Sequence, residues 1–156
     1  TAKGLAYALN VPVVNVPTLE AMAYNFYGTD KVICPIMDAR RNQVYTGIYS
    51  FENNGLSIYL DSSAMDIMEL IPKLQEIDKP VIFTGDGIPV FRDIIDKELK
   101  TPHEYGRAGF NRQRASSVAL LGAELYKAGK TEKAEEHLPE YLRMSQAERE
   151  RMEKNG

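Results

Sequence analysis

The sequence has few of the residues that carry thiol and metal chemistry. It contains one cysteine and two histidines among its 156 residues, and no tryptophan. A single cysteine excludes an internal disulfide and a cysteine-rich metal site, and Cys34 lies in the apolar run VICPIM, where a buried and inert thiol is expected. His103 and His137 lie far apart, and neither belongs to an HxxxH or HExxH spacing. The sequence therefore predicts no metal site.

Long apolar runs and an excess of basic residues are also missing. No stretch approaches the ~20 apolar residues of a membrane helix, so we expect a cytoplasmic protein without a membrane partner. The net charge is −3, which argues against a protein that binds nucleic acid without a partner. The length suits one domain with a substantial core.

The first ten residues have the composition of a helix. Leu5 and Leu9 are four residues apart, and three alanines accompany them. No initiator Met and no capping residue stand before this segment. We therefore expect the chain to be the C-terminal part of a longer protein.

The remaining pattern predicts a mixed sheet covered by helices. Strands are predicted at residues 11–16, 31–39, 43–51, 56–60 and 80–85, and helices at 19–27, from 63 through at least 74, at 86–99 and at 116–128. Asn54 and Gly55 are expected to form a hairpin turn, and Pro35 suggests an edge strand or an irregularity. Residues 100–115 are predicted as an irregular link, and Ser145 with Glu148 as the capping box of a charged last helix. Three meandering strands followed by strand–helix alternation are typical of an α/β domain.

Two turns are candidate anion or cofactor sites. In FTGDGIPVF, Gly85 and Gly87 lie between a strand and a helix, so their amides could face an anion. The motif lacks the P-loop lysine and the third Rossmann glycine, however, and Gly-Asp-Gly is also ordinary turn chemistry, which we favour.

The second candidate turn is MDARRNQ. Asp38 follows a strand and could hold Mg²⁺, while Arg40 and Arg41 could clamp a phosphate. A hairpin that cradles phosphate needs glycine, and here Ala39 and Arg40 follow the aspartate. A solvated turn in which Asp38 pairs with an arginine explains the residues equally well, so the residues alone leave this open. We identify no catalytic residue and no metal ligand.

Three segments together carry a family resemblance. TAKGLAYALNVPVV, MDARRNQVY and the later PEYLR resemble the TsaB (YeaZ) family of tRNA threonylcarbamoyladenosine biosynthesis, in the right order over residues 1–143. The resemblance implies an actin/hexokinase/Hsp70-like (RNase H-like) fold made of two related α/β halves. Residues 1–29 would end a truncated first half, residues 30–130 would form the complete second half, and residues 131–156 would form a tail with a charged helix.

The resemblance also implies a function without catalysis. The related enzyme TsaD binds ATP and a metal, and its histidine pair would fall at Thr18 and Met22, neither of which replaces histidine as a ligand. The chain is therefore expected to be an inactive paralogue without a cofactor. It would bind and activate a TsaD-like transferase, in a complex with a TsaE-like ATPase, and contact tRNA only indirectly.

Three alternatives remain open at this point. The first is a metal-dependent glycoprotease-like or ATP-hydrolysing enzyme of the same superfamily, whose site would lie upstream. The second is a homodimer through Leu5 and Leu9. The third is a module that binds tRNA directly through exposed arginines, which are scattered in the sequence: Arg40, Arg41, Arg112, Arg114 and Arg143.

Overall fold

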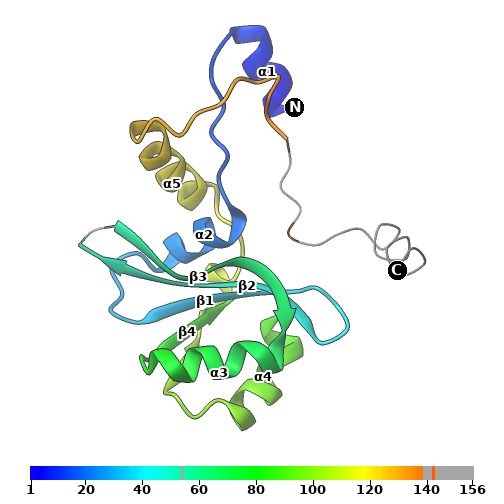
Figure 1. Cartoon of the computed structure of the whole chain (residues 1–156), viewed down its shortest axis with the longest axis vertical. Coiled ribbons are helices and arrows are strands. Elements are labelled where there is room, and N and C mark those ends of the chain that lie inside the picture. Colours follow the sequence, from blue (N-terminus) through cyan, green and yellow to red (C-terminus); the bar gives the residue numbers. More distant parts are fainter. Residues whose placement is uncertain (54, 139–141, 143–156) are drawn as a thin grey trace, which may run out of the picture.

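The structure is a computed structural model that describes residues 1–53, 55–138 and 142. Its centre is one five-stranded mixed sheet with strand order β3-β2-β1-β4-β5 (Figure 1). The strands are β1 (Val32–Asp38), β2 (Gln43–Glu52), β3 (Gly55–Asp66), β4 (Val81–Thr84) and β5 (His103–Tyr105). The β1–β2 and β2–β3 pairs are antiparallel, whereas β1–β4 and β4–β5 are parallel. The predicted α/β class is confirmed.

Helices cover both faces of the sheet. They are α1 (Ala2–Leu9), α2 (Thr18–Ala23), α3 (Ile67–Ile77), α4 (Ile88–Glu98) and α5 (Ala115–Lys127), with short 3₁₀ turns η1 (Tyr24–Phe26) and η2 (Ala108–Phe110). In Figure 1, α3 and α4 lie below the sheet, and α2 and α5 lie above it. The first helix, α1, stands apart from the sheet at the end of an extended segment. Among the described residues, no helix is long and apolar enough to span a membrane.

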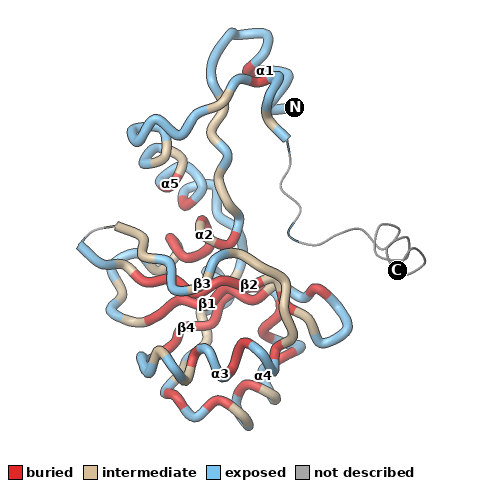
Figure 2. The backbone as a smooth tube through the Cα atoms, viewed as in Figure 1, coloured by how far each residue is buried: buried red, intermediate tan, exposed pale blue. Residues whose placement is uncertain are grey.

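The core fills both sides of the central strands. Val32, Cys34 and Ile36 of β1 pack with the cluster that includes α3 and α4, while Ile33 and Tyr49 pack against α2. Figure 2 shows buried residues concentrated in these strands and recurring along the helices that cover them. Coverage on both faces explains why these strands are almost continuously apolar. Cys34 is fully buried, so the expected buried cysteine is confirmed, and burial raises the pKa of its thiol to about 12.

The predicted strand at residues 11–16 is wrong. The structure has only an isolated bridge there, in which the amides of Val13 and Glu132 each donate to the other's carbonyl at 2.9 Å. This segment links α1 to α2 and does not reach the sheet (Figure 1). Its β-branched residues therefore have no ladder to join, and β-propensity alone does not make a strand.

Two other boundaries differ from the predictions because tertiary pairing overrides the local pattern. Strand β3 continues through Ser63 and Ala64 alongside β2, and α3 begins only after Asp66, whose Oδ1 accepts the Met68 amide at 2.8 Å. The region predicted as an irregular link contains β5, three residues that pair with β4. The expected charged last helix lies outside the described residues.

The β2–β3 hairpin is present, one residue earlier than predicted. Glu52 pairs with Gly55, and the positive φ of 52° is at Asn53. Gly55 therefore opens β3 instead of forming the turn, and Asn54 lies outside the described residues.

Pro35 lies at the centre of the sheet, so the edge position that it suggested is wrong. Strand β1 pairs with β2 at Ile33 and then from Ile36 onward, and Pro35 itself is opposite Thr84 of β4. The Thr46 hydroxyl donates to the Pro35 carbonyl at 2.8 Å, inside the core. The Thr46 side chain thus satisfies the buried Pro35 carbonyl at a break in the β1–β2 pairing, which is the irregularity that the proline also suggested.

Candidate functional site

The carboxyl ends of β1 and β4 form the candidate site. These strands are parallel neighbours, and the chain leaves β1 toward β2 on one side and β4 toward β5 on the other. Ligands of open α/β sheets bind at such a switch point. The residues of the two candidate turns all lie here, since Asp38 ends β1, Arg40 and Arg41 follow it, and Gly85 and Gly87 follow β4. A Cβ added at Gly87 would lie 3.4 Å from the Asp38 amide nitrogen, so the two turns touch.

Backbone packing accounts for both glycines. Gly85 has a φ of +114°, and a Cβ there would lie 2.1 Å from the Ile36 carbonyl oxygen. The Gly87 amide donates to the same oxygen at 3.0 Å, and a Cβ at Gly87 would lie 2.9 Å from it. The turn therefore packs directly against β1, and the Gly87 amide is already engaged and does not face an anion.

The MDARRNQ turn is a closed hairpin with an unusual backbone. Arg40, Arg41 and Asn42 have φ values of 63°, 55° and 59°, in the left-handed region that non-glycine residues rarely adopt. Asp38 Oδ1 accepts the Arg40 amide at 2.7 Å, and the Gln43 amide donates to the Arg40 carbonyl at 3.0 Å. The Asp38 carboxylate thus pairs with the backbone amide of Arg40 and not with a guanidinium, which is where the structure differs from the solvated turn considered above. Both arginine side chains are exposed, and within the described part of the chain neither forms an ion pair.

Residues 106–114 form a third segment at this edge. The Gly106 amide donates to the Phe83 carbonyl at 2.8 Å, and the Thr84 hydroxyl donates to the Phe110 carbonyl at 2.9 Å. Further along, Gln113 Nε2 lies 3.7 Å from the sulfur of Met37. The segment therefore passes from the end of β5 across β4 to β1.

This third segment brings arginines to the sheet edge. Arg112 and Arg114 were predicted to be exposed from the sequence, whereas Arg107 and the aromatic residues beside it were not identified. The run GRAGFNRQR, with three arginines and no acid, was the available signal.

The positions implied for metal-binding histidines present unsuitable groups. Thr18 is exposed at the start of α2, whereas Met22, one turn later, is 1% exposed and packs in the core cluster with Leu19 and Ile33. Across the described residues, no group of three or more His, Cys, Asp or Glu side chains could hold a metal ion.

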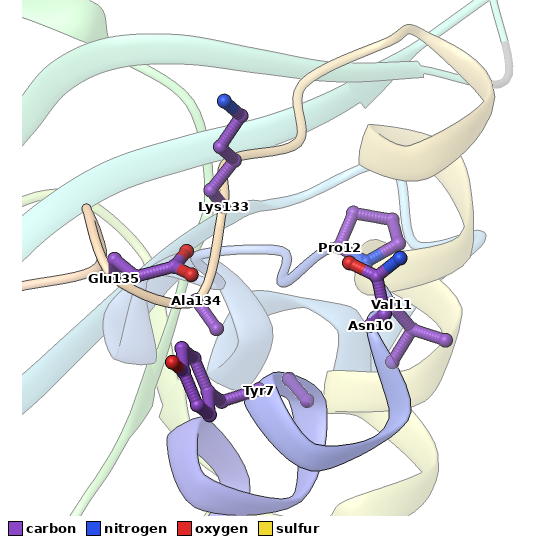
Figure 3. A pocket seen from close by; sticks show the side chains of 8 residues that line it. Tyr7, Asn10, Val11, Pro12, Lys133, Ala134 and Glu135 are labelled. Atoms are coloured by element: carbon purple, nitrogen blue, oxygen red, sulfur yellow. The ribbon is translucent and has the colours of Figure 1, made fainter.

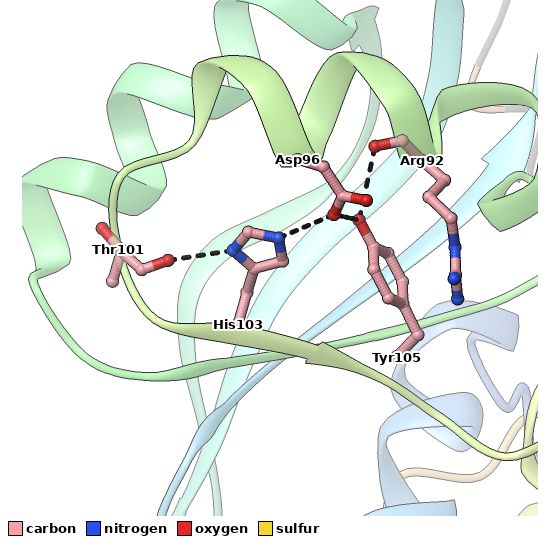
Figure 4. A network of polar contacts seen from close by, with 5 residues as sticks. All are labelled: Arg92, Asp96, Thr101, His103 and Tyr105. Carbon is pink, nitrogen blue, oxygen red and sulfur yellow. Dashed lines mark hydrogen bonds and ion pairs between the residues drawn. The ribbon is translucent and has the colours of Figure 1, made fainter.

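Both histidines of the chain are engaged in structural contacts. His137 Nδ1 lies 2.5 Å from Glu132 Oε1. In the network of Figure 4, His103 Nε2 lies 3.0 Å from Asp96 Oδ1, and its Nδ1 lies 3.0 Å from the Thr101 carbonyl. The Tyr105 hydroxyl donates to the same Asp96 oxygen at 2.6 Å. These bonds tie β5 to α4.

An Asp96→Asn variant is expected to be less stable than the parent at neutral pH and close to it in acid. The Tyr105 hydroxyl and then His103 hold the pKa of the Asp96 carboxyl below its ordinary value of 3.8. A depressed pKa contributes stability above the ordinary value, and this contribution is lost as pH falls through the folded-state pKa. Urea unfolding at several pH values measures the difference, with Asp93→Asn on the same helix as control. A difference independent of pH would contradict the assignment.

A separate pocket of about 370 Å³ lies beside α1 (Figure 3). Its lining combines the end of α1 with the segment around Ala134: Ala6, Tyr7, Asn10, Val11, Pro12, Lys133, Ala134 and Glu135. Lys3 Nζ holds the segment by donating to the Glu135 and His137 carbonyls at 3.2 and 2.9 Å. Figure 3 shows the Lys133 side chain directed away from Tyr7. The pocket thus lies between two chain segments that contact each other, and it is remote from the sheet edge.

Comparisons with known proteins agree on one family. The family model described as "TsaD: tRNA N6-adenosine threonylcarbamoyltransferase" matches residues 1–151. The chain is 36% identical over 149 residues to the "tRNA threonylcarbamoyladenosine biosynthesis protein TsaB" of Bacillus subtilis (strain 168), covering 94% of this chain and 62% of that protein. It is 27% identical over 146 residues to the Escherichia coli (strain K12) protein of the same name, covering 91% and 62%. The chain thus spans less than two thirds of the length of these relatives.

Solved structures show the same fold. YeaZ from Pseudomonas aeruginosa superposes with a TM-score of 0.71 at 21% identity, covering 89% of this chain and 64% of that one. A second structure, described as an uncharacterized protein with similarity to peptidase YEAZ from Pseudomonas aeruginosa, gives 0.72 at 21%, covering 90% and 63%. Together with the family model, these neighbours fit the expected actin-like fold.

Proposed function

Because this chain belongs to the family described as TsaD: tRNA N6-adenosine threonylcarbamoyltransferase, and resembles its TsaB (YeaZ) members, we propose that it acts in threonylcarbamoyladenosine modification of tRNA as a non-catalytic subunit. Its role would be to bind a TsaD-like transferase in the cytoplasm and activate it, in a complex that includes a TsaE-like ATPase. The observation that carries the proposal is the 36% identity to a TsaB protein over 94% of this chain.

The geometry around α2 supports the absence of catalysis. A metal-assisted transferase or protease needs several ligands that converge on one point. Here Met22 is buried in the core, and His103 and His137 are held by Asp96 and Glu132. These residues explain why we favour an accessory subunit over the glycoprotease-like or ATP-hydrolysing alternative.

Exposed apolar side chains on α1 support a protein partner. Leu5, Tyr7 and Leu9 are 59%, 64% and 68% exposed, and a cluster of large exposed apolar groups is typical of a contact surface. The same residues would also serve a homodimer. Sedimentation of the chain with and without the transferase separates the two cases, because a heteromeric surface leaves the isolated chain monomeric.

Reconstitution tests the proposal. Threonylcarbamoyladenosine formed on tRNA is measured with the TsaD-like transferase and the TsaE-like ATPase, with and without this chain, and with Bacillus subtilis TsaB in its place as control. We expect product above background only when the chain or TsaB is present. Equal product without either, or product with TsaB but not with this chain, would overturn the proposal. ATP hydrolysis or metal uptake by the chain alone would favour the enzymatic alternative.

A further inference from the structure

We propose that the surface formed by Arg92, Tyr105, Arg107, Phe110, Arg112 and Arg114, the arginine–aromatic surface, binds a single-stranded segment of RNA. Four of these residues belong to the segment 106–114 that crosses the sheet edge, and the other two come from α4 and β5. The inference replaces the expectation that the chain contacts tRNA only indirectly, and it depends on the proposed function for the choice of RNA over DNA.

Positive charge is concentrated in this one segment. Residues 106–114 carry three arginines and no acidic residue, so the rest of the chain has a net charge of −3 − 3 = −6. Arg107, Arg112 and Arg114 are exposed, and in the part of the chain that the structure describes none of them forms an ion pair. The nearby Glu104 is neutralised by Lys31 at 2.8 Å. The guanidinium groups are therefore free to meet phosphates.

Aromatic rings line a pocket beside these arginines. The pocket has a volume of about 420 Å³ and is lined by Asn25, Phe26, Glu104, Tyr105, Gly106, Arg107 and Phe110. The centroids of the Phe26 and Phe110 rings lie 5.9 Å apart, and Phe110 is 39% exposed although the Arg114 guanidinium lies over its ring, so part of the Phe110 side chain is open to solvent. An open aromatic face beside cations is the usual platform for an unpaired base.

Gly106 lets the chain pass close to this platform. A Cβ at Gly106 would lie 2.7 Å from Phe26 Cζ and 2.6 Å from Asn111 Oδ1. A Cβ there would force the Phe26 ring or the Asn111 side chain to shift, so glycine lets the backbone beside Arg107 lie against the ring that forms the pocket wall.

Two arginines stack on aromatic rings. The guanidinium carbon of Arg114 lies 4.9 Å from the centre of the Phe110 ring, and that of Arg92 lies 4.1 Å from the centre of the Tyr105 ring (Figure 4). A stacked guanidinium keeps its in-plane N–H groups available for phosphate oxygens. Arg92 thus covers one face of Tyr105, whose ring also stacks on Phe83 and whose hydroxyl donates to Asp96. Arg114 lies over the Phe110 ring, so the stacked guanidinium groups extend the flat surface beside the pocket.

The backbone beneath the arginines is fixed. Asn25 Nδ2 donates to the carbonyls of Phe110 and Arg112 at 2.9 and 3.0 Å, and its Oδ1 accepts the Ser117 hydroxyl at 2.7 Å. Because the backbone that carries these arginines is already ordered, binding a ligand loses less conformational entropy. An acidic protein would be attracted by the arginines alone and would leave the aromatic pocket unused. A nucleotide strand would use both, because its phosphates contact arginines and its bases contact aromatic rings. A single nucleic-acid strand therefore accounts for both features, and the proposed function selects RNA.

Fluorescence anisotropy of the whole chain with a labelled single-stranded RNA of about ten nucleotides tests the inference. We compare the parent with the triple variant Arg107→Gln, Arg112→Gln, Arg114→Gln at several salt concentrations. We expect the triple variant to bind at least about 10-fold more weakly at low salt, with a log–log salt slope smaller by about 2, since each phosphate contact contributes ~0.7. Phe110→Ala should weaken binding by about 5- to 100-fold without changing the slope.

A matched triple variant controls for net charge. Lys73→Gln, Lys100→Gln, Lys127→Gln removes the same charge from exposed positions elsewhere, and we expect affinity and slope close to those of the parent. Equal weakening by both triple variants, no RNA binding at low salt, or arginine-dependent binding of polyglutamate instead of RNA would each overturn the inference. Circular dichroism confirms that each variant is folded. The binding assay contains no transferase, so an absence of RNA binding would not contradict the proposed function. Conversely, a failed reconstitution would not affect the interpretation of the RNA-binding measurement.

Discussion

Replacing Gly85 with alanine is expected to lower the free energy of unfolding by roughly 4 kcal/mol. Two costs add at this position. The φ of +114° is a conformation that side chains with a Cβ rarely adopt, and the new Cβ would lie 2.1 Å from the Ile36 carbonyl oxygen. That oxygen belongs to the central strand β1 and also accepts the Gly87 amide, so the backbone can move away only by breaking this bond. Typical domains have only 5–15 kcal/mol in total, so much of the stability would be lost.

Gly129→Ala is the matched control for this prediction. Gly129 also has a positive φ, +73°, but a Cβ there would meet no atom within 4 Å. Its replacement should cost about 1 kcal/mol, the usual penalty for the left-handed region alone. Urea unfolding of both variants measures the two losses. Equal losses would mean that the dihedral angle, and not the contact with β1, determines the requirement for glycine at Gly85.

The elements whose pattern reflects burial were predictable from the sequence. Strand alternation predicts Val44, Thr46 and Ile48 on one face and Tyr45, Tyr49 and Phe51 on the other, and the two core clusters divide the apolar residues among them in the same way. In this strand, alternation matches the sheet geometry because both faces are covered. Long amphipathic segments such as α4 were found for the same reason, since one face of the helix is buried.

Elements that depend on distant partners were not predictable. Residues 11–16 have strand composition, but their partner is a single residue near position 132, so no strand forms. Strand β5 is three residues long, too short for a local pattern, and exists because β4 offers an open edge. The end of β3 has helical spacing, yet pairing with β2 keeps it extended as far as Asp66. In each case a tertiary contact decides between two local possibilities.

The candidate site shows the same division. Asp38, Arg40, Gly85 and Gly87 could be named from their positions after strands, but their mutual contact follows only from the parallel pairing of β1 and β4. The approach of Phe26 to the segment 106–114 could not be inferred, because residues far apart in the sequence meet through η1 and η2. Family resemblance supplied the functional context, which residue chemistry alone left open.

Removing the Phe83 ring is expected to destabilise the protein far more than removing the Phe110 ring. Phe83 is fully buried in β4 and stacks on Tyr105 at 5.8 Å, so Phe83→Ala should cost about 3–5 kcal/mol through lost contacts and a cavity. Phe110 is 39% exposed, so Phe110→Ala should cost at most about 1 kcal/mol. Urea unfolding of both variants provides the comparison.

The contrast between these two variants also decides how the RNA measurements are interpreted. If Phe110→Ala is nearly as stable as the parent and binds RNA weakly, its ring contacts the ligand, since a folded protein has lost only an exposed aromatic face. If it is instead as unstable as Phe83→Ala, the Phe110 ring supports the fold through Phe26, and weaker RNA binding would follow from a displaced 106–114 segment. Stability thus separates a ring that binds from a ring that positions the arginines.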